Sequence, residues 1–460
     1  MKIIKPEFQA VIMAGGKGSR MPEVSSSRPK CLLPIGNKPL IWYPLQMLEK
    51  AGFLDVIVVV LETQKVEIQK VVDKTDLKIK IDYVTIPSTE DLGTADSLRL
   101  ISDKIVSDII VVSCDFITDL NLNPVLDLFR RHDASVVSLL FEDKQEPVPL
   151  PGPKTKNKPE RDLIGIDLNT NRLVFQASSS DFDEFVSFSK KLIRKHPNIT
   201  IFSRLLDSHF YIIKHWVLNY ISHEKSFSTI KGELLPHIVK KQLSKKPKLP
   251  DAADKNQSIV NAEVRNDVYQ FIQEDELDEK VRNTSSYNDH SGDLKPTYHG
   301  DIIKCYSHIV NNNFGIRVNT LQSYCLANAK ILEKWNVITS TNITDLVRIH
   351  SNAEIHSNQV DEQCLVGEGT VIAEKTSIRN SFIGANCVVN SKVRVFNCIL
   401  MNNVRILGIA FLQNCIICDG VTIESQVELK DCLVGNNHTI PEGSNHSNEI
   451  LTADDKLMEI

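Results

Sequence analysis

The sequence lacks the features that would place it at a membrane or on a nucleic acid. It has no run close to the roughly 20 consecutive apolar residues that a membrane-spanning helix needs. Its net charge is −5, so there is no overall basic excess with which to bind nucleic acid. Residues 1–8 carry two lysines and a proline but no apolar stretch, so we expect no secretory signal. We therefore expect neither a membrane nor a nucleic acid as a direct partner.

The sequence also lacks the cysteine pattern of a disulfide framework, although it has ten cysteines. Four occupy one position of a C-terminal repeat, where Ser381 stands once: Cys364, Cys398, Cys415 and Cys432. A small buried apolar role fits that position. Cys415 and Cys418 form a CxxC pair, but the other repeats have no second cysteine, so we do not interpret the pair as a zinc site. Free thiols are typical of a reducing compartment, and we predict a cytoplasmic (cytosolic) protein.

The repeat itself is a phrase of four residues that recurs five times at an interval of 17 residues. Each copy has a polar residue, a small residue and two apolar residues, and the copies are 363–366, 380–383, 397–400, 414–417 and 431–434. Within each period an apolar residue recurs every six residues, so three rungs make one coil. This pattern predicts a three-sided parallel β-helix whose inward residues stack from coil to coil. We place Ile399 among these inward residues.

The first half of the chain alternates apolar runs with helical patterns. Residues 8–14, 56–61 and 109–113 are expected to be buried strands, and residues 39–51 a helix that ends before Gly52. Unbroken apolar strands that alternate with helices indicate a parallel sheet covered on both faces. The predicted fold class of this half is therefore α/β.

These patterns divide the chain into successive regions. We expect a first domain over 1–335, a β-helix over 345–445 and a tail over 446–460. Within the first domain, residues 244–300 are polar, and we expect them to form a mobile insertion.

A glycine-rich loop follows the first predicted strand. Residues 14–22 read Ala-Gly-Gly-Lys-Gly-Ser-Arg-Met-Pro, and residues 28–35 read Arg-Pro-Lys-Cys-Leu-Leu-Pro-Ile. Glycines between a strand and a helix allow backbone N–H groups to converge on phosphate oxygens, and Arg20 and Lys30 could add charged contacts. A tight turn without a ligand, with both cations in structural ion pairs, remains the alternative.

The spacing between this loop and the Pro-Lys-x-Leu-Leu-Pro element resembles the signature of the sugar nucleotidyltransferases. These enzymes join a nucleoside triphosphate and a sugar 1-phosphate and release pyrophosphate. Residues 92–95 resemble the family's base-contacting turn, and 113–115 resemble the strand end that carries its first magnesium-binding aspartate. The resemblance implies a Rossmann-like domain and a left-handed β-helix. It also implies a vestigial nucleotide-binding set, namely Gly15, Gly16, Gly18, Arg20, Lys30, Gly93 and Asp115.

The sequence departs from that family where the chemistry would take place. The second metal-binding aspartate is replaced by Arg317, and the lysine expected after residues 172–175 is missing. Asp96 also stands where the family has a small neutral residue. An arginine repels a magnesium ion and cannot ligate it. We therefore predict a pseudoenzyme that has no catalytic residue, no metal and no cofactor.

Three further segments, 36–45, 93–99 and 113–119, resemble the gamma-subunit family of eukaryotic translation initiation factor 2B. That resemblance implies a non-catalytic subunit of a complex that exchanges GDP for GTP on initiation factor 2. It implies pairing with the epsilon subunit and assembly with the alpha, beta and delta subunits. It also implies contact with the GTP-binding subunit of initiation factor 2.

Other hypotheses stay open at the level of sequence. The chain could be an active sugar-1-phosphate nucleotidyltransferase that makes a GDP- or ADP-sugar, or a regulatory subunit of such an enzyme. A second open question concerns Phe396, Met401 and Phe411. These residues either form an exposed apolar face of the β-helix or pack inward at a corner.

Overall fold

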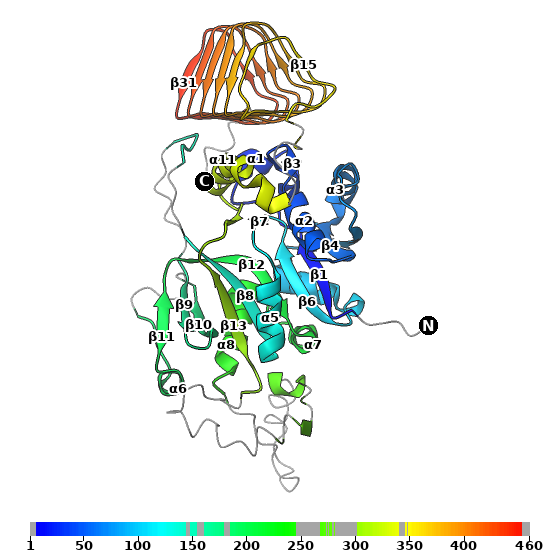
Figure 1. The fold of residues 1–460 in the computed structure, drawn as a ribbon, viewed down its shortest axis with the longest axis vertical. Coiled ribbons are helices and arrows are strands. Elements are labelled where there is room, and N and C mark those ends of the chain that lie inside the picture. The colour runs from blue at the N-terminus through cyan, green and yellow to red at the C-terminus, as the bar shows by residue number, and fades with distance from the viewer. Residues whose placement is uncertain are drawn as a thin grey trace.

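The computed structural model shows a large α/β region and a β-helix stacked across one end of it (Figure 1). It describes residues 6–143, 148–153, 161–178, 185–244, 267–272, 274, 276–277, 280, 301–339, 346 and 348–452. Among these residues, no helix is both long enough and apolar enough to cross a bilayer.

The α/β region is built on a sheet of ten strands. Their order is β11 (Ile199–Phe202), β9 (Leu163–Asp167), β10 (Arg172–Ala177), β13 (Cys305–Val310), β8 (Val136–Glu142), β12 (Leu205–Ile213), β6 (Asp108–Ser113), β1 (Phe8–Met13), β4 (Asp55–Leu61) and β5 (Lys80–Ile86). The parallel arrangement predicted from sequence is confirmed for β6, β1, β4 and β5. Strand β12 runs antiparallel to both of its neighbours, so the whole sheet is mixed. A buried apolar run predicts a strand but not its direction.

Helices cover both faces of this sheet. One face carries α2 (Trp42–Lys50), α3 (Lys65–Val72) and α5 (Asn123–His132). The other face carries α4 (Thr94–Leu100), α7 (His215–His223), the π-helical turn η5 (Ile230–Leu234) and α8 (Leu235–Lys241). The predicted helix over 39–51 corresponds to α2, whose buried Leu45, Met47 and Leu48 lie against the first face.

Smaller elements lie between the sheet and the β-helix. They are α1 (Pro22–Ser25), the hairpin of β2 (Pro34–Ile35) and β3 (Lys38–Pro39), the pair β7 (Phe116–Thr118) and β14 (Gly315–Arg317), and α11 (Leu321–Thr339). Figure 1 shows α1, β3 and α11 directly beneath the β-helix. The short helix α6 (Lys190–Lys195) lies near β11 at the far edge.

The β-helix consists of three parallel sheets of six short strands. The first contains β15 (Glu354–Ile355), β18 (Val371–Ile372), β21 (Val388–Val389), β24 (Arg405–Ile406), β27 (Thr422–Ile423) and β30 (Thr439–Ile440). The second contains β16 (Gln359–Val360), β19 (Ser377–Arg379), β22 (Val393–Phe396), β25 (Ala410–Gln413), β28 (Val427–Lys430) and β31 (Asn445–Ser447). The third contains β17 (Leu365–Val366), β20 (Phe382–Ile383), β23 (Ile399–Leu400), β26 (Ile416–Ile417), β29 (Leu433–Val434) and β32 (Ile450–Leu451). Residues one period apart pair directly, as Leu400 does with Ile417, so the three-sided parallel prediction is confirmed.

The polar residue that opens each of the last four repeats has a structural role that its type explains. Asn380, Asn397, Asn414 and Asp431 all adopt positive φ, between 45° and 54°, a region that asparagine and aspartate tolerate better than most residues. Their side chains form a ladder in which each amide donates to the next residue, at 2.8–2.9 Å, and Asp431 is the final acceptor. Each coil corner is thereby tied to the next one.

The two apolar residues of each repeat face opposite ways. The second residue, such as Ile417, packs in the interior of the β-helix. The first residue points outward and packs against the α/β region; these outward residues are Leu365, Phe382, Ile399, Ile416 and Leu433. Our placement of Ile399 inside the β-helix was therefore wrong. Its side chain is buried, but by the neighbouring region, because the strand alternation sends it to the outer face.

The same cluster answers the question about the three large apolar residues. Met401 is fully buried at the junction with the α/β region. Phe396 remains 45% exposed on β22, and Phe411 is half-buried on β25. The β-helix therefore has an exposed apolar face at Phe396 and Phe411, and Met401 is not part of it.

The division into domains stays our proposal. Strand pairing of the β-helix runs from Glu354 to Leu451, which carries it past the predicted boundary at 445. Most of the predicted insertion over 244–300, and the tail beyond residue 452, lie outside the described residues.

Candidate functional site

The glycine-rich loop connects β1 to α1 along one wall of a cavity. Gly18 has a φ of +75°, and a Cβ at this position would come within 2.8 Å of the Ser25 Oγ. The Ser25 hydroxyl donates to the carbonyl oxygens of Gly18 and Met21, at 3.1 and 2.7 Å. Gly18 is therefore required for the turn itself, whether or not a ligand binds.

The cavity next to this loop has a volume of about 410 Å³. Among the described residues that line it, five are cationic and one is acidic: Lys17, Arg20, Lys30, Lys231, Arg317 and Asp162. Of the predicted nucleotide-binding set, Gly16, Gly18, Arg20 and Lys30 line the wall. Among the described residues, that wall does not include Gly15, Gly93 or Asp115. The cavity is strongly suited to an anion.

Asp115 lies directly beneath the cavity and is 1% exposed. Its Oδ1 atom accepts hydrogen bonds from the Ser113 hydroxyl at 2.6 Å and from the Arg317 Nε at 3.1 Å. Its Oδ2 atom accepts from the Lys30 ammonium. Burial alone would raise the pKa of Asp115, but the charges of Arg317 and Lys30 outweigh burial and hold this pKa well below its ordinary value.

Strand pairing explains why Arg317 meets Asp115. Asp115 immediately precedes β7, and β14 ends at Arg317, which pairs antiparallel with Phe116. The Val318 N–H also donates to the Asp115 carbonyl oxygen, at 2.8 Å. The backbone therefore fixes residue 317 next to the carboxylate, in the place where the sequence comparison expected a second metal ligand.

A magnesium ion does not fit this arrangement. Both oxygens of Asp115 already accept from cationic donors, and Arg317 stands where a second carboxylate would be needed. Among the described residues, no group of three or more histidine, cysteine, aspartate and glutamate side chains could hold a metal ion. Asp115, Lys30 and Arg317 form an ion-pair network instead.

The turn over residues 92–95 is occupied by the chain itself. The Ser228 carbonyl oxygen accepts from the Ala95 and Asp96 N–H groups, at 2.8 and 3.3 Å. A Cβ on Gly93 would lie 2.2 Å from that oxygen, so only glycine allows this close approach. The Gly93 N–H donates to Asp96 Oδ2, at 3.2 Å.

Asp96, which the sequence placed near a nucleotide, has its charge balanced locally. It forms an ion pair with Arg99 on the same helix and accepts from the Ser228 hydroxyl. Burial alone would raise the pKa of Asp96, but hydrogen bonds from Ser228, Arg99 and Gly93 lower it overall. Asp96 is also absent from the described lining of the cavity.

The far wall of the cavity contains residues that the sequence argument missed. Asp162 forms an ion pair with Lys231 at 2.6 Å, and His209 lies at a bulge of β12 with a φ of +52°. Lys231 belongs to the π-helical turn η5. Burial and the nearby charge of Arg317 lower the pKa of His209 well below its usual value, so its imidazole is neutral at physiological pH. No local motif marks these residues, because folding brings them together from the loop before β9, from β12 and from η5.

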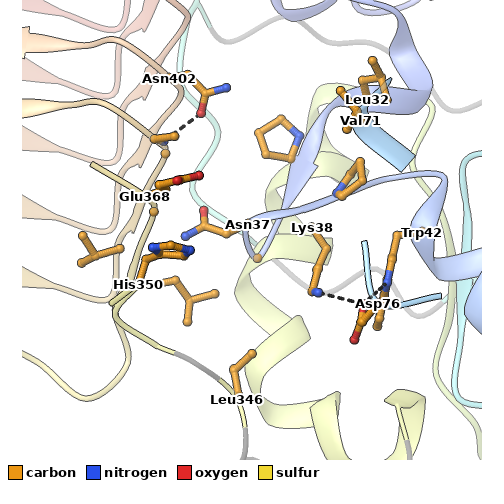
Figure 2. Close-up of a pocket in the computed structure, with 18 of the residues that line it drawn as sticks. Leu32, Asn37, Lys38, Trp42, Val71, Asp76, Leu346, His350, Glu368 and Asn402 are labelled. Atoms are coloured by element: carbon orange, nitrogen blue, oxygen red, sulfur yellow. Dashed lines mark hydrogen bonds and ion pairs between the residues drawn. The ribbon is translucent and has the colours of Figure 1, made fainter. Parts of the chain in front are cut away.

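A second cavity, of about 640 Å³, lies between the α/β region and the β-helix. Figure 2 shows Asn37 on one side and Glu368 and His350 on the other. The Asn37 amide donates to the Ile383 carbonyl oxygen at 3.2 Å, and Lys38 and Trp42 both donate to Asp76 Oδ1 at 3.1 Å. Of these three bonds, that of Asn37 crosses the junction, while Lys38, Trp42 and Asp76 all belong to the α/β region.

The cysteines fit the role predicted for them. All ten are free, and Cys364, Cys398, Cys415 and Cys432 are buried in the interior of the β-helix. The CxxC pair is split between two environments, because Cys418 faces the α/β region while Cys415 faces inward. The two sulfurs are therefore not arranged as a metal clamp.

Comparison with known proteins agrees with both regions of this fold. Residues 9–149 match the family model described as nucleotidyl transferase, and residues 350–445 match the one described as EIF2B subunit epsilon LbH domain. The domain with the ten-stranded sheet is thus a Rossmann-like nucleotidyltransferase domain, followed by a left-handed β-helix.

Three relatives carry the name translation initiation factor eIF2B subunit gamma. The relative from Caenorhabditis elegans is 35% identical over 51% of this chain, and that from Schizosaccharomyces pombe is 36% identical over 53%. The relative from Dictyostelium discoideum is 29% identical over 83% of this chain. The matched regions span 59%, 54% and 88% of these relatives, so the first two matches cover little more than half of their length. By the domain matches and these relatives, the chain is similar to eIF2B gamma proteins.

Proposed function

We propose that the chain is a non-catalytic subunit of the eIF2B complex, which exchanges GDP for GTP on initiation factor 2. The observation that carries this proposal is the match to eIF2B gamma proteins, one of them over 83% of the chain. In this proposal the chain pairs with the epsilon subunit and assembles with the alpha, beta and delta subunits in the cytosol. Its ten free cysteines are consistent with that compartment.

The proposal includes the loss of transferase chemistry. Joining two anionic substrates requires charge neutralisation by metal ions at the reacting phosphates. Here Asp115 is neutralised by Lys30 and Arg317 instead, so the residues that would hold the metal are committed to each other. The predicted nucleotide-binding residues then serve as a binding surface or as a structural remnant.

In this proposal the chain contributes to nucleotide exchange by positioning its partner subunits, without performing chemistry itself. The nucleotidyltransferase domain and the β-helix pack against each other through one apolar cluster, so partners can dock on both at once. Such a subunit promotes exchange by contacts that favour the nucleotide-free state of the GTP-binding subunit of initiation factor 2.

The test is to isolate the endogenous assembly through a tag on this chain, measure its native mass and identify every subunit. We expect a large complex that contains a longer paralogue and that accelerates GDP release from initiation factor 2. In parallel, the purified chain is incubated with Mg²⁺, a nucleoside triphosphate and a sugar 1-phosphate. Pyrophosphate release at an enzymatic rate, or a homo-oligomer without translation factors, would instead support an active transferase.

A further inference from the structure

Arg317 stands where this fold would hold a metal ligand, and this changes what the cavity above it can bind. A metal-dependent site uses carboxylates to hold a cation, and the cation then holds the phosphate. Here the cation is part of the protein, because Arg317 occupies that place and is fixed by the pairing of β14 with β7. Its side chain is 21% exposed and lines the cavity, so it is not sealed away with Asp115.

The charge at the cavity wall favours an anion without help from a metal ion. Asp115 offsets part of the charge of Lys30 and Arg317, and Asp162 offsets Lys231. Two further cationic residues, Lys17 and Arg20, line the opposite side on the glycine-rich loop. The partner of Lys17 is Asp91, which is 95% exposed and holds it only weakly. Because Lys30 and Arg317 share the single carboxylate of Asp115, the wall carries a cationic surplus.

Two buried polar atoms at the far wall independently indicate a ligand. The Oδ1 atom of Asp162 and the Nε2 atom of His209 are buried, yet neither has a hydrogen-bond partner among the described residues. Asp162 is 6% exposed, and both residues line the cavity. A buried polar atom without a partner costs about 1–3 kcal/mol, so such atoms are rare unless something else satisfies them.

The backbone around these atoms is also unusual. His209 is held at a φ of +52° in a bulge, and Lys231 and Gly232 lie in a π-helical turn. Positive φ at a non-glycine residue and π-helical turns are both concentrated at functional sites.

We propose that this cavity binds a phosphate-bearing anion without a metal ion, with the Arg317 guanidinium in place of the divalent cation. The phosphate lies between Arg317 and the glycine-rich loop, where Lys17 and Arg20 supply further charge. The rest of the ligand reaches Asp162 and His209, and it supplies a hydroxyl or amide donor to the Asp162 carboxylate. The inference concerns binding only and includes no bond-making step.

The test measures binding of inorganic pyrophosphate to the full-length chain by isothermal titration calorimetry, in EDTA and in excess Mg²⁺. We expect one site that binds in EDTA at least as tightly as in Mg²⁺. The Arg317→Gln variant should weaken this binding by at least tenfold, while Arg317→Lys, which keeps a cation, should retain most of it. The control is Arg405→Gln, an exposed arginine of the β-helix, and it should bind like the wild type.

The reverse substitution sharpens the test. Arg317→Asp places a second carboxylate beside Asp115, so binding in EDTA should be lost and should return on addition of Mg²⁺. The melting temperature of each variant shows whether it is folded. If the variants at residue 317 do not fold, Lys231→Gln replaces them and should weaken binding in EDTA at least threefold.

Three results would overturn the proposal. They are no binding of pyrophosphate in EDTA up to millimolar concentration, binding that requires Mg²⁺ in the wild type, and unchanged binding by a folded Arg317→Gln variant. The calorimetry reports on the cavity alone and does not involve initiation factor 2. Failure here would therefore leave the proposed role in the exchange complex untouched, and failure of that role would leave the binding result standing.

Discussion

Replacing Ile416 by alanine should destabilise the protein, because its side chain forms part of the junction between the two regions. Ile416 is 2% exposed and packs in the cluster that joins the β-helix to the nucleotidyltransferase domain. The change removes three carbon groups, worth about 0.8 kcal/mol each, and leaves a cavity that adds to the loss. We expect the free energy of unfolding to fall by about 3 kcal/mol.

A matched control lies on the same β-helix. Ile409 also points outward, but it is 52% exposed and has no neighbouring domain to bury it fully. Ile409→Ala should therefore cost about 1 kcal/mol or less. The comparison holds the residue type and the substitution constant, so the difference measures burial at the junction.

Urea unfolding followed by tryptophan fluorescence is suited to this measurement. Of the three tryptophans in the chain, Trp42 and Trp335 belong to the junction cluster and stack with centroids 5.9 Å apart. Their emission should change when the β-helix separates from the domain. If Ile416→Ala unfolded within 0.5 kcal/mol of the wild type, the β-helix would not be docked through this face.

Three further predictions concern other parts of the molecule. Asp115→Asn should lower stability by about 3 kcal/mol at pH 7, because Lys30 and Arg317 lose their shared partner. The pKa of Asp115 is depressed in the folded state, so this contribution is present above about pH 4 and fades as the pH falls further. The difference in free energy of unfolding between variant and wild type should be smaller at pH 3 than at pH 7. An equal difference at both pH values would contradict the ion-pair network. Asn397→Ala should cost about 1–2 kcal/mol in thermal unfolding, since it breaks the ladder and strains a φ of 52°. Asn397→Gly breaks the ladder without that strain and should cost less. If both variants lost the same stability, the positive φ of residue 397 would not contribute to the cost. Cys398→Ser should change stability by only about 1 kcal/mol, because Ser381 already fills the equivalent position and donates to the Arg379 carbonyl at 2.7 Å. Mass analysis of the intact protein should find no metal bound to Cys398, and a bound zinc ion would refute the structural role.

The repeats revealed more of the fold than any other part of the sequence, because each coil packs on the coil that follows it in the chain. Strict periodicity identified the inward residues, such as Ile417, since each must stack on its counterpart one coil away. The same period marks Leu400 as inward, so strand alternation sends its neighbour Ile399 outward, and our placement of Ile399 inside overlooked this. The sequence did not show that a docked domain buries this outer face.

The candidate site was predictable where it is local in sequence. Gly16, Gly18, Arg20 and Lys30 lie within one loop and its continuation, and all four line the cavity. The substitution at Arg317 was also visible, because aligning the motif was enough. Its ion pair with Asp115 was not, since that contact depends on how β14 pairs with β7 across the fold.

The far wall of the cavity was not predictable from sequence patterns at all. Asp162, His209 and Lys231 come from three separate segments of the chain that share no motif and no spacing. Their significance rests on burial and on missing partners, which exist only in three dimensions. A polar residue next to an apolar strand is too common to stand out on its own.

The corner of the β-helix at Asp419 restricts how this chain could change length. Arg28 of the first domain forms an ion pair with Asp419, and Ser27 donates to the same carboxylate. Neighbouring strands are separated by about 4.8 Å, so inserting or deleting one whole coil before Asp419 would leave the interior intact but move this acceptor out of reach. Coils added after Leu451 would disturb neither contact. Variation in coil number among proteins of this kind is therefore expected at the C-terminal end of the β-helix, while the segment between the domain junction and Asp419 keeps a fixed length.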